Sequence, residues 1–330
     1  MSRFNILSLS GGGFFGLYTA TVLADLEQKA GKPIGQCFDL IAGTSIGGII
    51  ALGIAAEKTA DDIKKHIEKN GPYIFSNSPR ANGNLLKLYK LARSSYWAKY
   101  RTTALRETVS DIFGATLQMA DLKHRVLIPA VNLTKGAPQI FKTPHHPNFH
   151  MDSKLKVIEV ALATSAAPTY FPLAEIGDSL YADGGLYANS PDLIALHEAE
   201  CFLNQDMQDI HVLSIGTTTS QFSFSHNMNK NMGWRQWVDE DRLTNVIIAS
   251  QQQSVDFMMK HKLNERYLRM DQIQSREQER DLALDVATAS AQKTICGLAD
   301  ATIRAHINSS ILKSFLGHSA HFPAFADIEA

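Results

Sequence analysis

Two short apolar segments of this chain each run straight into a glycine-rich turn that is followed by a helical pattern. Residues 4–9 (FNILSL) precede the turn SGGG at residues 10–13, and residues 38–42 precede the turn GTSIG at residues 43–47. Buried strands that alternate with helices are typical of an α/β domain with a mostly parallel sheet. Ligands bind such sheets at the carboxyl ends of the strands. We therefore expect both turns at the ligand-binding edge of one sheet.

The alternation of strands and helices continues to about residue 217. Further strands are expected over residues 125–133, 140–142, 180–183 and 211–216, and helices over residues 16–29, 46–57, 61–69, 154–163 and 190–200. The polar segment 227–233 interrupts this pattern, helical texture returns over residues 234–263, and the stretch 288–315 closes the chain. The sequence therefore places one compositional boundary near residues 217–233.

The turn at residues 43–47 carries the strongest chemical signal. A serine at the apex of a sharp strand-to-helix turn has a strained backbone, and only glycine fits two residues away on either side. Ser45 meets this requirement between Gly43 and Gly47. Its hydroxyl would project at the sheet edge beside a helix N-terminus, where negative charge is favoured. The pattern predicts a serine nucleophile, and the alternative is a glycine-rich turn with an incidental serine.

The first glycine-rich loop has two chemical uses and one structural one. Consecutive glycines leave backbone N–H groups uncovered, so that Gly11, Gly12 and Gly13 can converge on an anion. One use is an oxyanion hole for acyl transfer. The other is dinucleotide binding in an oxidoreductase, because Gly16 completes G-x-G-x-x-G, but that site needs an acidic residue at the end of the second strand. Asp39 stands at the start of that strand, and a turn without a ligand is the remaining alternative.

Two further motifs complete the set, DGG at residues 183–185 and ATSAAP at residues 163–168. Asp-Gly is first of all a turn dipeptide. In the company and order of the other motifs, however, it makes residues 5–217 resemble the patatin-like phospholipases. The resemblance implies a three-layer α/β/α fold and a mostly helical C-terminal region, residues 218–330, packed on the catalytic domain. It also implies a lipid acyl hydrolase that uses no metal and no cofactor.

The resemblance assigns roles to individual residues. Ser45 corresponds to the family's nucleophile and Asp183 to its partner. The oxyanion hole corresponds to Gly11, Gly12 and Gly13. The family's glycine loop usually begins with Asp and carries Arg or Lys before its last glycine, whereas this chain has Ser10 and Phe15 there. This departure leaves the oxyanion donors to the backbone alone, and it allows Phe14 and Phe15 to line an acyl pocket.

A serine–aspartate dyad needs an aspartate whose pKa lies near the working pH. A free Asp has a pKa of ~3.9, and burial raises it. A dry lipid pocket would supply that burial at Asp183. The alternative is a Ser–Asp–His triad with His197 or His211, although both are expected to be structural or surface histidines. The histidines of segment 145–150 (HHPNFH) are expected in an exposed loop, because their spacing does not match zinc sites.

Charge is balanced overall and concentrated in one segment. The 330 residues include 32 Lys or Arg and 33 Asp or Glu, and the net charge of −1 argues against DNA or RNA as a partner. Residues 69–106, here called the basic segment, contain Lys and Arg interleaved with aromatic residues and no Asp or Glu. They suit an anionic membrane surface or an anionic nucleotide, and an ordinary solvated helix is the alternative. The candidates for these contacts are Lys87, Lys90, Arg93, Tyr96, Trp97 and Arg101.

A narrower resemblance bears on regulation. The loop GGGFFG, the turn GTSIGG and the extended C-terminal region are similar to bacterial patatin-like effectors of antiphage signalling. This similarity implies a membrane phospholipid substrate, activation by a cyclic dinucleotide, and a cytoplasmic enzyme acting at the inner face of the cell membrane. Three well-separated cysteines and the lack of an export signal agree with the cytoplasm. An unregulated lipase or esterase is the alternative, and the sequence also allows a homo-oligomer.

Overall fold

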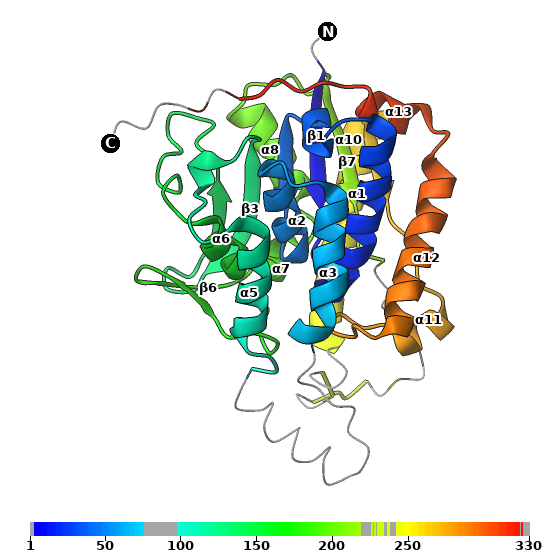
Figure 1. Cartoon of the computed structure of the whole chain (residues 1–330). Helices are drawn as coiled ribbons and strands as arrows, with labels where there is room; N and C mark the ends of the chain where they lie inside the picture. The colour runs from blue at the N-terminus through cyan, green and yellow to red at the C-terminus, as the bar shows by residue number, and fades with distance from the viewer. Residues whose placement is uncertain are drawn as a thin grey trace.

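One mixed sheet runs through the centre of the molecule (Figure 1). The computed structural model describes residues 3–75, 98–218 and 242–323, together with residues 226, 228, 230–233, 236–237 and 325. Five strands of the described residues are parallel, in the order β3 (Val126–Asn132), β2 (Leu40–Gly43), β1 (Phe4–Leu9), β7 (Ile210–Ile215) and β8 (Tyr267–Met270). Antiparallel strands extend the sheet beyond β3, namely β4 (Ala137–Lys142), β5 (Ala174–Ile176) and β6 (Ser179–Asp183).

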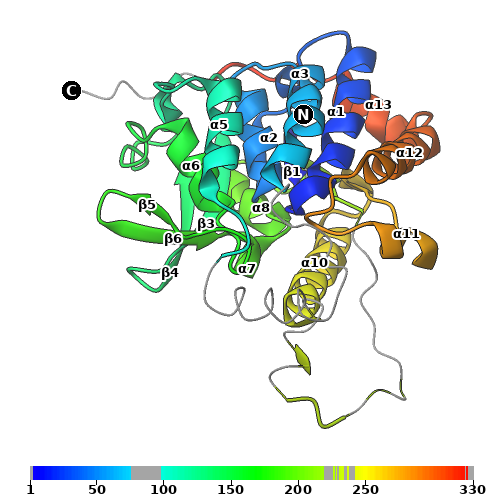
Figure 2. The ribbon, with the colours of Figure 1, turned by 60° about the horizontal axis from the view of Figure 1, so that its bottom comes forward.

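Helices cover both faces of this sheet (Figure 2). One face carries α1 (Gly16–Ala30), α2 (Ile46–Ala55), α3 (Ala60–Ile74), α5 (Thr102–Phe113), α6 (Val157–Thr164), α12 (Ala289–His306) and α13 (Ser310–Leu316). The other face carries α8 (Asp192–Cys201) and α10 (Arg242–Leu263). The expected three-layer α/β/α fold with a mostly parallel sheet is therefore confirmed.

Strand β1 shows why the central strands read as continuous apolar runs. Leu7 and Leu9 point into the core beneath α1 and α2, whereas Phe4 and Ile6 point into the core beneath α8 and α10. All four side chains are buried. A parallel strand covered on both faces has no solvent side, so polar residues do not alternate along it.

The structure changes several of the expected element boundaries. The expected helix 61–69 continues in α3 to Ile74 although it contains Pro72, and the short strand expected at residues 140–142 is the longer β4. The closing stretch 288–315 divides into α12 and α13, because Ser309 caps a new helix N-terminus with its side chain. Sequence reasoning missed α5, whose apolar face lies at the end of the basic segment, and it missed β8.

The part of the chain after residue 217 contacts the preceding part closely. Strand β8 pairs with β7 in the central sheet, and α12 packs against α1, where the buried Tyr18 hydroxyl donates to Thr302 Oγ1 at 2.8 Å. The boundary between residues 217 and 218 stays a prediction. None of the helices within the described residues is long and apolar enough to cross a bilayer.

Candidate active site

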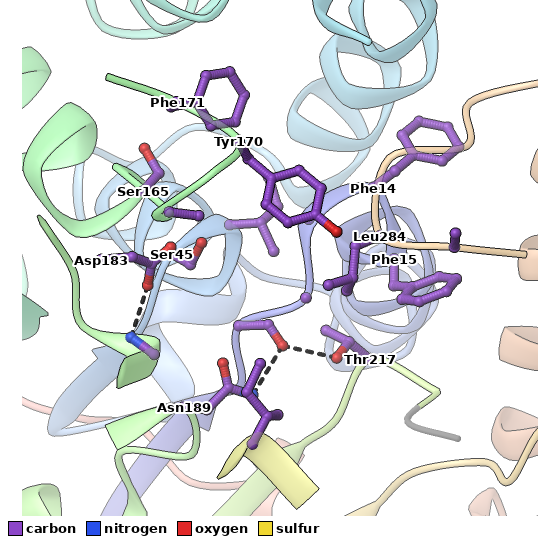
Figure 3. A pocket seen from close by; sticks show the side chains of 18 of the residues that line it. Phe14, Phe15, Ser45, Ser165, Tyr170, Phe171, Asp183, Asn189, Thr217 and Leu284 are labelled. Carbon is purple, nitrogen blue, oxygen red and sulfur yellow. Dashed lines mark hydrogen bonds between the residues drawn. The ribbon is translucent and has the colours of Figure 1, made fainter. Parts of the chain in front are cut away.

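A cavity of about 660 Å³ opens where β1, β2 and β6 end, and all four sequence motifs reach it (Figure 3). The glycine loop, Ser45, Asp183 and the segment after α6 line its polar end. Apolar side chains of α2, α3 and α5 line the rest, including Ile49, Ile67 and Val109. The cavity therefore combines a small polar end with a long apolar wall, which is the arrangement that a lipid acyl ester requires.

The serine turn has the geometry that its sequence predicts. Ser45 has a φ of 56° and a ψ of −125°, a conformation that L-residues rarely adopt. A Cβ on Gly43 would lie 2.2 Å from the Gly47 carbonyl oxygen, and a Cβ on Gly47 would lie 2.5 Å from the Leu9 carbonyl oxygen. Both glycines are thus required by close backbone contacts, and they hold Ser45 in a strained conformation.

Threonines attach this turn to the surrounding loops. The Ser45 amide donates to Thr164 Oγ1 at 3.0 Å, and the Thr164 hydroxyl donates to the Pro129 carbonyl at 2.6 Å. On the other side, the Thr44 hydroxyl donates to the Ala188 carbonyl at 2.6 Å. Thr164 belongs to the ATSAAP motif, so the structure gives that motif a physical role in holding the serine.

Asp183 lies directly beside Ser45 at the end of β6. The Ser45 and Asp183 side chains meet at the polar end of the cavity, and the Gly185 amide donates to Asp183 Oδ1 at 2.7 Å. Burial raises the pKa of Asp183 to about 6, against the opposing effects of the nearby Ser45 hydroxyl and the Gly185 amide. A carboxylate with this pKa is a much better match for proton transfer near neutral pH than a free aspartate is.

Distant residues orient the glycine loop. The Gly11 carbonyl accepts from Thr217 Oγ1 at 2.9 Å and from Asn189 Nδ2 at 3.3 Å, while the Gly11 amide donates to the Asn189 carbonyl at 2.9 Å (Figure 3). In a trans peptide the next N–H points opposite to the carbonyl, so the Gly12 amide points away from Thr217. Within the described part of the chain, the Gly12 and Gly13 amides have no hydrogen-bond acceptor. Both are therefore available to an oxyanion.

The end of the loop is held from the C-terminal part of the chain. The Phe14 amide donates to the Leu284 carbonyl at 2.7 Å. Gly13 has a φ of 55°, and a Cβ there would lie 2.3 Å from the Leu284 carbonyl oxygen. The rings of Phe14 and Phe15 line the cavity, as the sequence predicted.

A buried arginine lies beneath the start of the glycine loop. One guanidinium nitrogen of Arg269, in β8, donates to hydroxyl oxygens of Ser10, Ser190 and Ser214 at 3.0, 3.1 and 2.8 Å. Its other terminal nitrogen donates to Asp271 at 2.8 Å. Ser10, which stands where the family usually has Asp, is therefore a hydrogen-bond acceptor for a cation that comes from another strand.

Histidines do not reach the serine and the aspartate. His197 and His211 are absent from the cavity lining that the described residues form; the first contacts Cys201 Sγ at 3.3 Å and the second donates to the Asp209 carbonyl at 2.9 Å. The prediction that segment 145–150 is an exposed loop is wrong for His145. Its side chain is fully buried and lies 3.0 Å from Glu198 Oε1, because a buried carboxylate on α8 needs a partner.

Asp39, the acidic residue that a dinucleotide-binding site would need, lies far from the glycine loop. Asp39 Oδ2 accepts from the Asn5 amide at 2.8 Å and lies 2.8 Å from His318 Nε2. These contacts are at the amino ends of β1 and β2, whereas the glycine loop lies at the carboxyl end of β1. Asp39 therefore lies at the edge of the sheet opposite the loop and cannot reach a ribose bound there.

The candidates for activator or membrane contact fall mostly outside the described residues. This holds for Lys87, Lys90, Arg93, Tyr96 and Trp97. Arg101 is described, and it is exposed directly before α5. Their contact with an activator or a membrane stays a prediction.

Sequence reasoning missed the residues that support the site from a distance. These are Asn189, Thr217, Arg269 and Leu284. The positions of Asn189 and Thr217 in the sequence could have indicated their role. Asn189 follows the DGG motif and Thr217 follows β7, and both elements end at the edge of the sheet where ligands bind. Arg269 and Leu284 carried none, because nothing near them in the sequence resembles a motif.

Known proteins resemble this chain over most of its length. A family described as "Patatin-like phospholipase" matches residues 7–196, more than half of the chain. A protein named cGAMP-activated phospholipase from Pseudomonas aeruginosa (strain BWHPSA011 / Pa011) is 41% identical over 98% of this chain and 94% of its own length. Proteins of the same name from Vibrio cholerae and Escherichia coli are 38% and 36% identical, over 88% and 89% of this chain and 87% and 86% of their own lengths.

Proposed function

Because the chain belongs to the patatin-like phospholipase family, it is a lipid acyl hydrolase, and we propose that Ser45 and Asp183 carry its reaction as a dyad. The observation that supports this most directly is that Ser45 shares the polar end of the cavity with a buried aspartate whose pKa is raised to about 6. The glycine loop supplies the oxyanion hole through the amides of Gly12 and Gly13, with Gly11 holding the loop against Asn189 and Thr217.

The first half of the reaction forms an acyl-enzyme. Ser45 Oγ attacks the carbonyl carbon of a phospholipid acyl ester while its proton passes to the Asp183 carboxylate. The carbonyl oxygen becomes negatively charged and accepts hydrogen bonds from the Gly12 and Gly13 amides. When the intermediate collapses, the lysophospholipid oxygen leaves and takes the proton from Asp183, and the acyl chain remains on Ser45.

The second half repeats the same proton path with water. A water molecule attacks the acyl-enzyme and gives its proton to Asp183. Collapse breaks the bond to Ser45 Oγ, which recovers that proton, and a fatty acid leaves. The apolar wall formed by α2, α3 and α5 holds the acyl chain through both steps.

A cyclic dinucleotide is the proposed activator, and a membrane phospholipid at the inner face of the cell membrane is the proposed substrate. Support comes from three relatives named cGAMP-activated phospholipase that align over most of their length. The activator can act only by binding the competent state more tightly, and a shift from 1:99 to 99:1 needs ~5.5 kcal/mol of such preference. Its proposed contacts are the candidates of the basic segment.

The test is fatty-acid release from mixed phospholipid vesicles, with and without a panel of cyclic dinucleotides. We expect low release from the protein alone, higher release with one dinucleotide, and none from Ser45→Ala under any condition. Full hydrolysis that no dinucleotide changes would support an unregulated lipase instead. The paired change Lys90→Glu and Arg93→Glu separates the two uses of the basic segment, because lost dinucleotide binding marks an activator site and lost vesicle binding alone marks a membrane face.

A further inference from the structure

The wall of the cavity beside the glycine loop comes from the segment between α11 (Arg276–Asp281) and α12. Leu284 contributes the carbonyl that accepts the Phe14 amide at 2.7 Å and that leaves no room for a Cβ at Gly13. Gly13 is one of the two proposed oxyanion donors, so the position of the Leu284 carbonyl determines where that amide points. Any residue that fixes Leu284 therefore acts on the oxyanion hole.

Asp285 is the residue that ties this segment to the opposite side of the cavity. Its carboxylate accepts from the Tyr100 hydroxyl at 2.8 Å and pairs with Lys99 Nζ. The Asp285 side chain is only 10% exposed, whereas that of Lys99 is 39% exposed. The ion pair therefore lies at the surface on one side and against the protein on the other.

Lys99 and Tyr100 are themselves fixed to the segment that follows the ATSAAP motif. The Lys99 amide donates to the Thr169 carbonyl at 2.9 Å, and the Tyr100 amide donates to the Tyr170 carbonyl at 2.8 Å. The Tyr100 ring also packs against Phe171, with ring centroids 5.8 Å apart. Leu284, Tyr170 and Phe171 all line the cavity (Figure 3).

These contacts form a continuous belt around the cavity. It runs from the Phe14 amide to the Leu284 carbonyl, through Asp285 to Lys99 and Tyr100, and on to the backbone beside Phe171. One end of the belt is the glycine loop and the other is the segment that follows Ser165. Asp285 is the polar link between two parts of the chain that are 185 residues apart.

We propose that Asp285 is a positioning residue for the oxyanion hole: it holds the Leu284 carbonyl, which in turn holds Gly13 and Phe14. This rests on the proposed function of the glycine loop. Oxyanion donors act on the transition state, whereas the apolar wall binds the substrate equally well before and during reaction. Loss of Asp285 therefore lowers kcat and leaves KM nearly unchanged.

We expect the fold to tolerate the loss of this link. The segment has further anchors, because Leu282 is buried and the Val286 amide closes a local turn on the Ala283 carbonyl at 3.1 Å. A partly exposed ion pair contributes ~0–1 kcal/mol to folding. A change in kcat is consequently separable from unfolding.

The experiment compares Asp285→Ala, Asp285→Asn, Lys99→Met and Lys99→Arg in the full-length protein. Hydrolysis of p-nitrophenyl butyrate gives kcat and KM, a fluorophosphonate titrates the active sites, and its rate of reaction with Ser45 reports on the oxyanion hole directly. We expect kcat per titrated site and the phosphonylation rate of Asp285→Ala to fall together by about 10-fold, with KM within about 2-fold. We expect smaller decreases in kcat and in the phosphonylation rate for Asp285→Asn and Lys99→Met, and values near those of the wild type for Lys99→Arg.

The matched control is Asp256→Asn, which removes an ion pair with Lys260 on α10 outside the cavity lining and keeps full activity. An unchanged kcat per titrated site in Asp285→Ala, with only a lower Tm, would overturn the positioning role. If Asp285→Ala does not fold, kcat per titrated site of Lys99→Met tests the positioning role instead, because this variant removes the same ion pair from the exposed side. A wild type that is not labelled at Ser45 would instead refute the proposed function, so the two failures are distinguishable.

Discussion

The serine turn and the glycine loop lie side by side in the active site, yet they are held in opposite ways. The strained shape of the serine turn comes from close contacts of its own glycines, with Gly43 against the Gly47 carbonyl and Gly47 against Leu9 in β1, while Thr164 and Ala188 add hydrogen bonds at its edges. The glycine loop is held by Asn189, Thr217 and Leu284, which follow it by 178, 206 and about 270 residues.

This difference separates the two components of the reaction. The strained conformation of the nucleophile is encoded mainly in five consecutive residues, so we expect changes outside the turn and its partner Thr164 to leave it in place. The position of the oxyanion donors depends on the assembly of the whole chain, so distant changes reach it. Catalysis can then be lowered through the loop while the nucleophile stays reactive.

Ser45→Ala is the change with the largest expected effect. Loss of the nucleophile removes the covalent path, and we expect hydrolysis to fall by at least ~10⁴-fold with no change in the circular dichroism spectrum. Fluorophosphonate labelling should disappear as well. Ordinary turnover by a folded Ser45→Ala protein would mean that another residue is the nucleophile.

Asp183→Asn keeps the shape of the base and removes its function, with an expected loss of ~10³–10⁴-fold in kcat. The folded pKa of about 6 lies above the reference value of 3.8, so the ionised carboxylate costs the folded state up to about 3 kcal/mol at neutral pH. The same variant should therefore have a higher Tm than the wild type at pH 7, and this difference should vanish below about pH 4. His197→Ala and His211→Ala are the controls, and a loss in either that matched Asp183→Asn would support a triad.

The pH profile tests whether Asp183 acts as a base. Because the group must be deprotonated to accept the Ser45 proton, activity should fall as the pH drops through about 6, and by about 10-fold at pH 5. The midpoint of this pH profile is set by Asp183 beside Ser45. Asp285→Ala should therefore lower kcat equally at every pH and leave the midpoint unchanged. A shifted curve in that variant would show that the belt acts on the base rather than on the loop.

Thr217→Val has the smallest expected effect and addresses the loop alone. It removes one hydrogen bond to the Gly11 carbonyl, worth ~1 kcal/mol, so kcat should fall about 5-fold. The midpoint of the pH profile of activity should not change. Thr21→Val is a matched control, because Thr21 is a buried threonine whose hydroxyl donates to the Leu17 carbonyl within α1. Equal losses in both variants would indicate a general effect on stability.

Local spacing was enough to predict which residues meet in the cavity. Ser45, Asp183 and the three glycines each lie in a short motif whose spacing has a steric cause, and the structure brings them together, while their catalytic roles stay predictions. Arg269 was not found, because an arginine inside the strand YLRM argues against burial until its partners Ser10, Ser190 and Ser214 are known.

The misplacement of His145 has a similar origin. A polar segment rich in histidine is typical of an exposed loop, and Glu198 on α8 is typical of a solvated helix face. Each residue makes the burial of the other possible, through a contact that spans 53 residues. Pairs of this kind are invisible in a single sequence, because neither member shows the pattern of a buried residue.

The glycine loop is synthesised well before the residues that orient it. The loop leaves the ribosome before the residues that orient it, and at ~5–20 residues per second Leu284 follows it by tens of seconds. A nascent chain that already contains Ser45 and Asp183 still lacks Leu284, and β8 has not yet joined the sheet. We expect a ribosome-stalled chain ending at residue 270 to resist the fluorophosphonate that labels the finished protein. The oxyanion hole would thus be completed only after Leu284 has left the ribosome, well after Ser45 and Asp183.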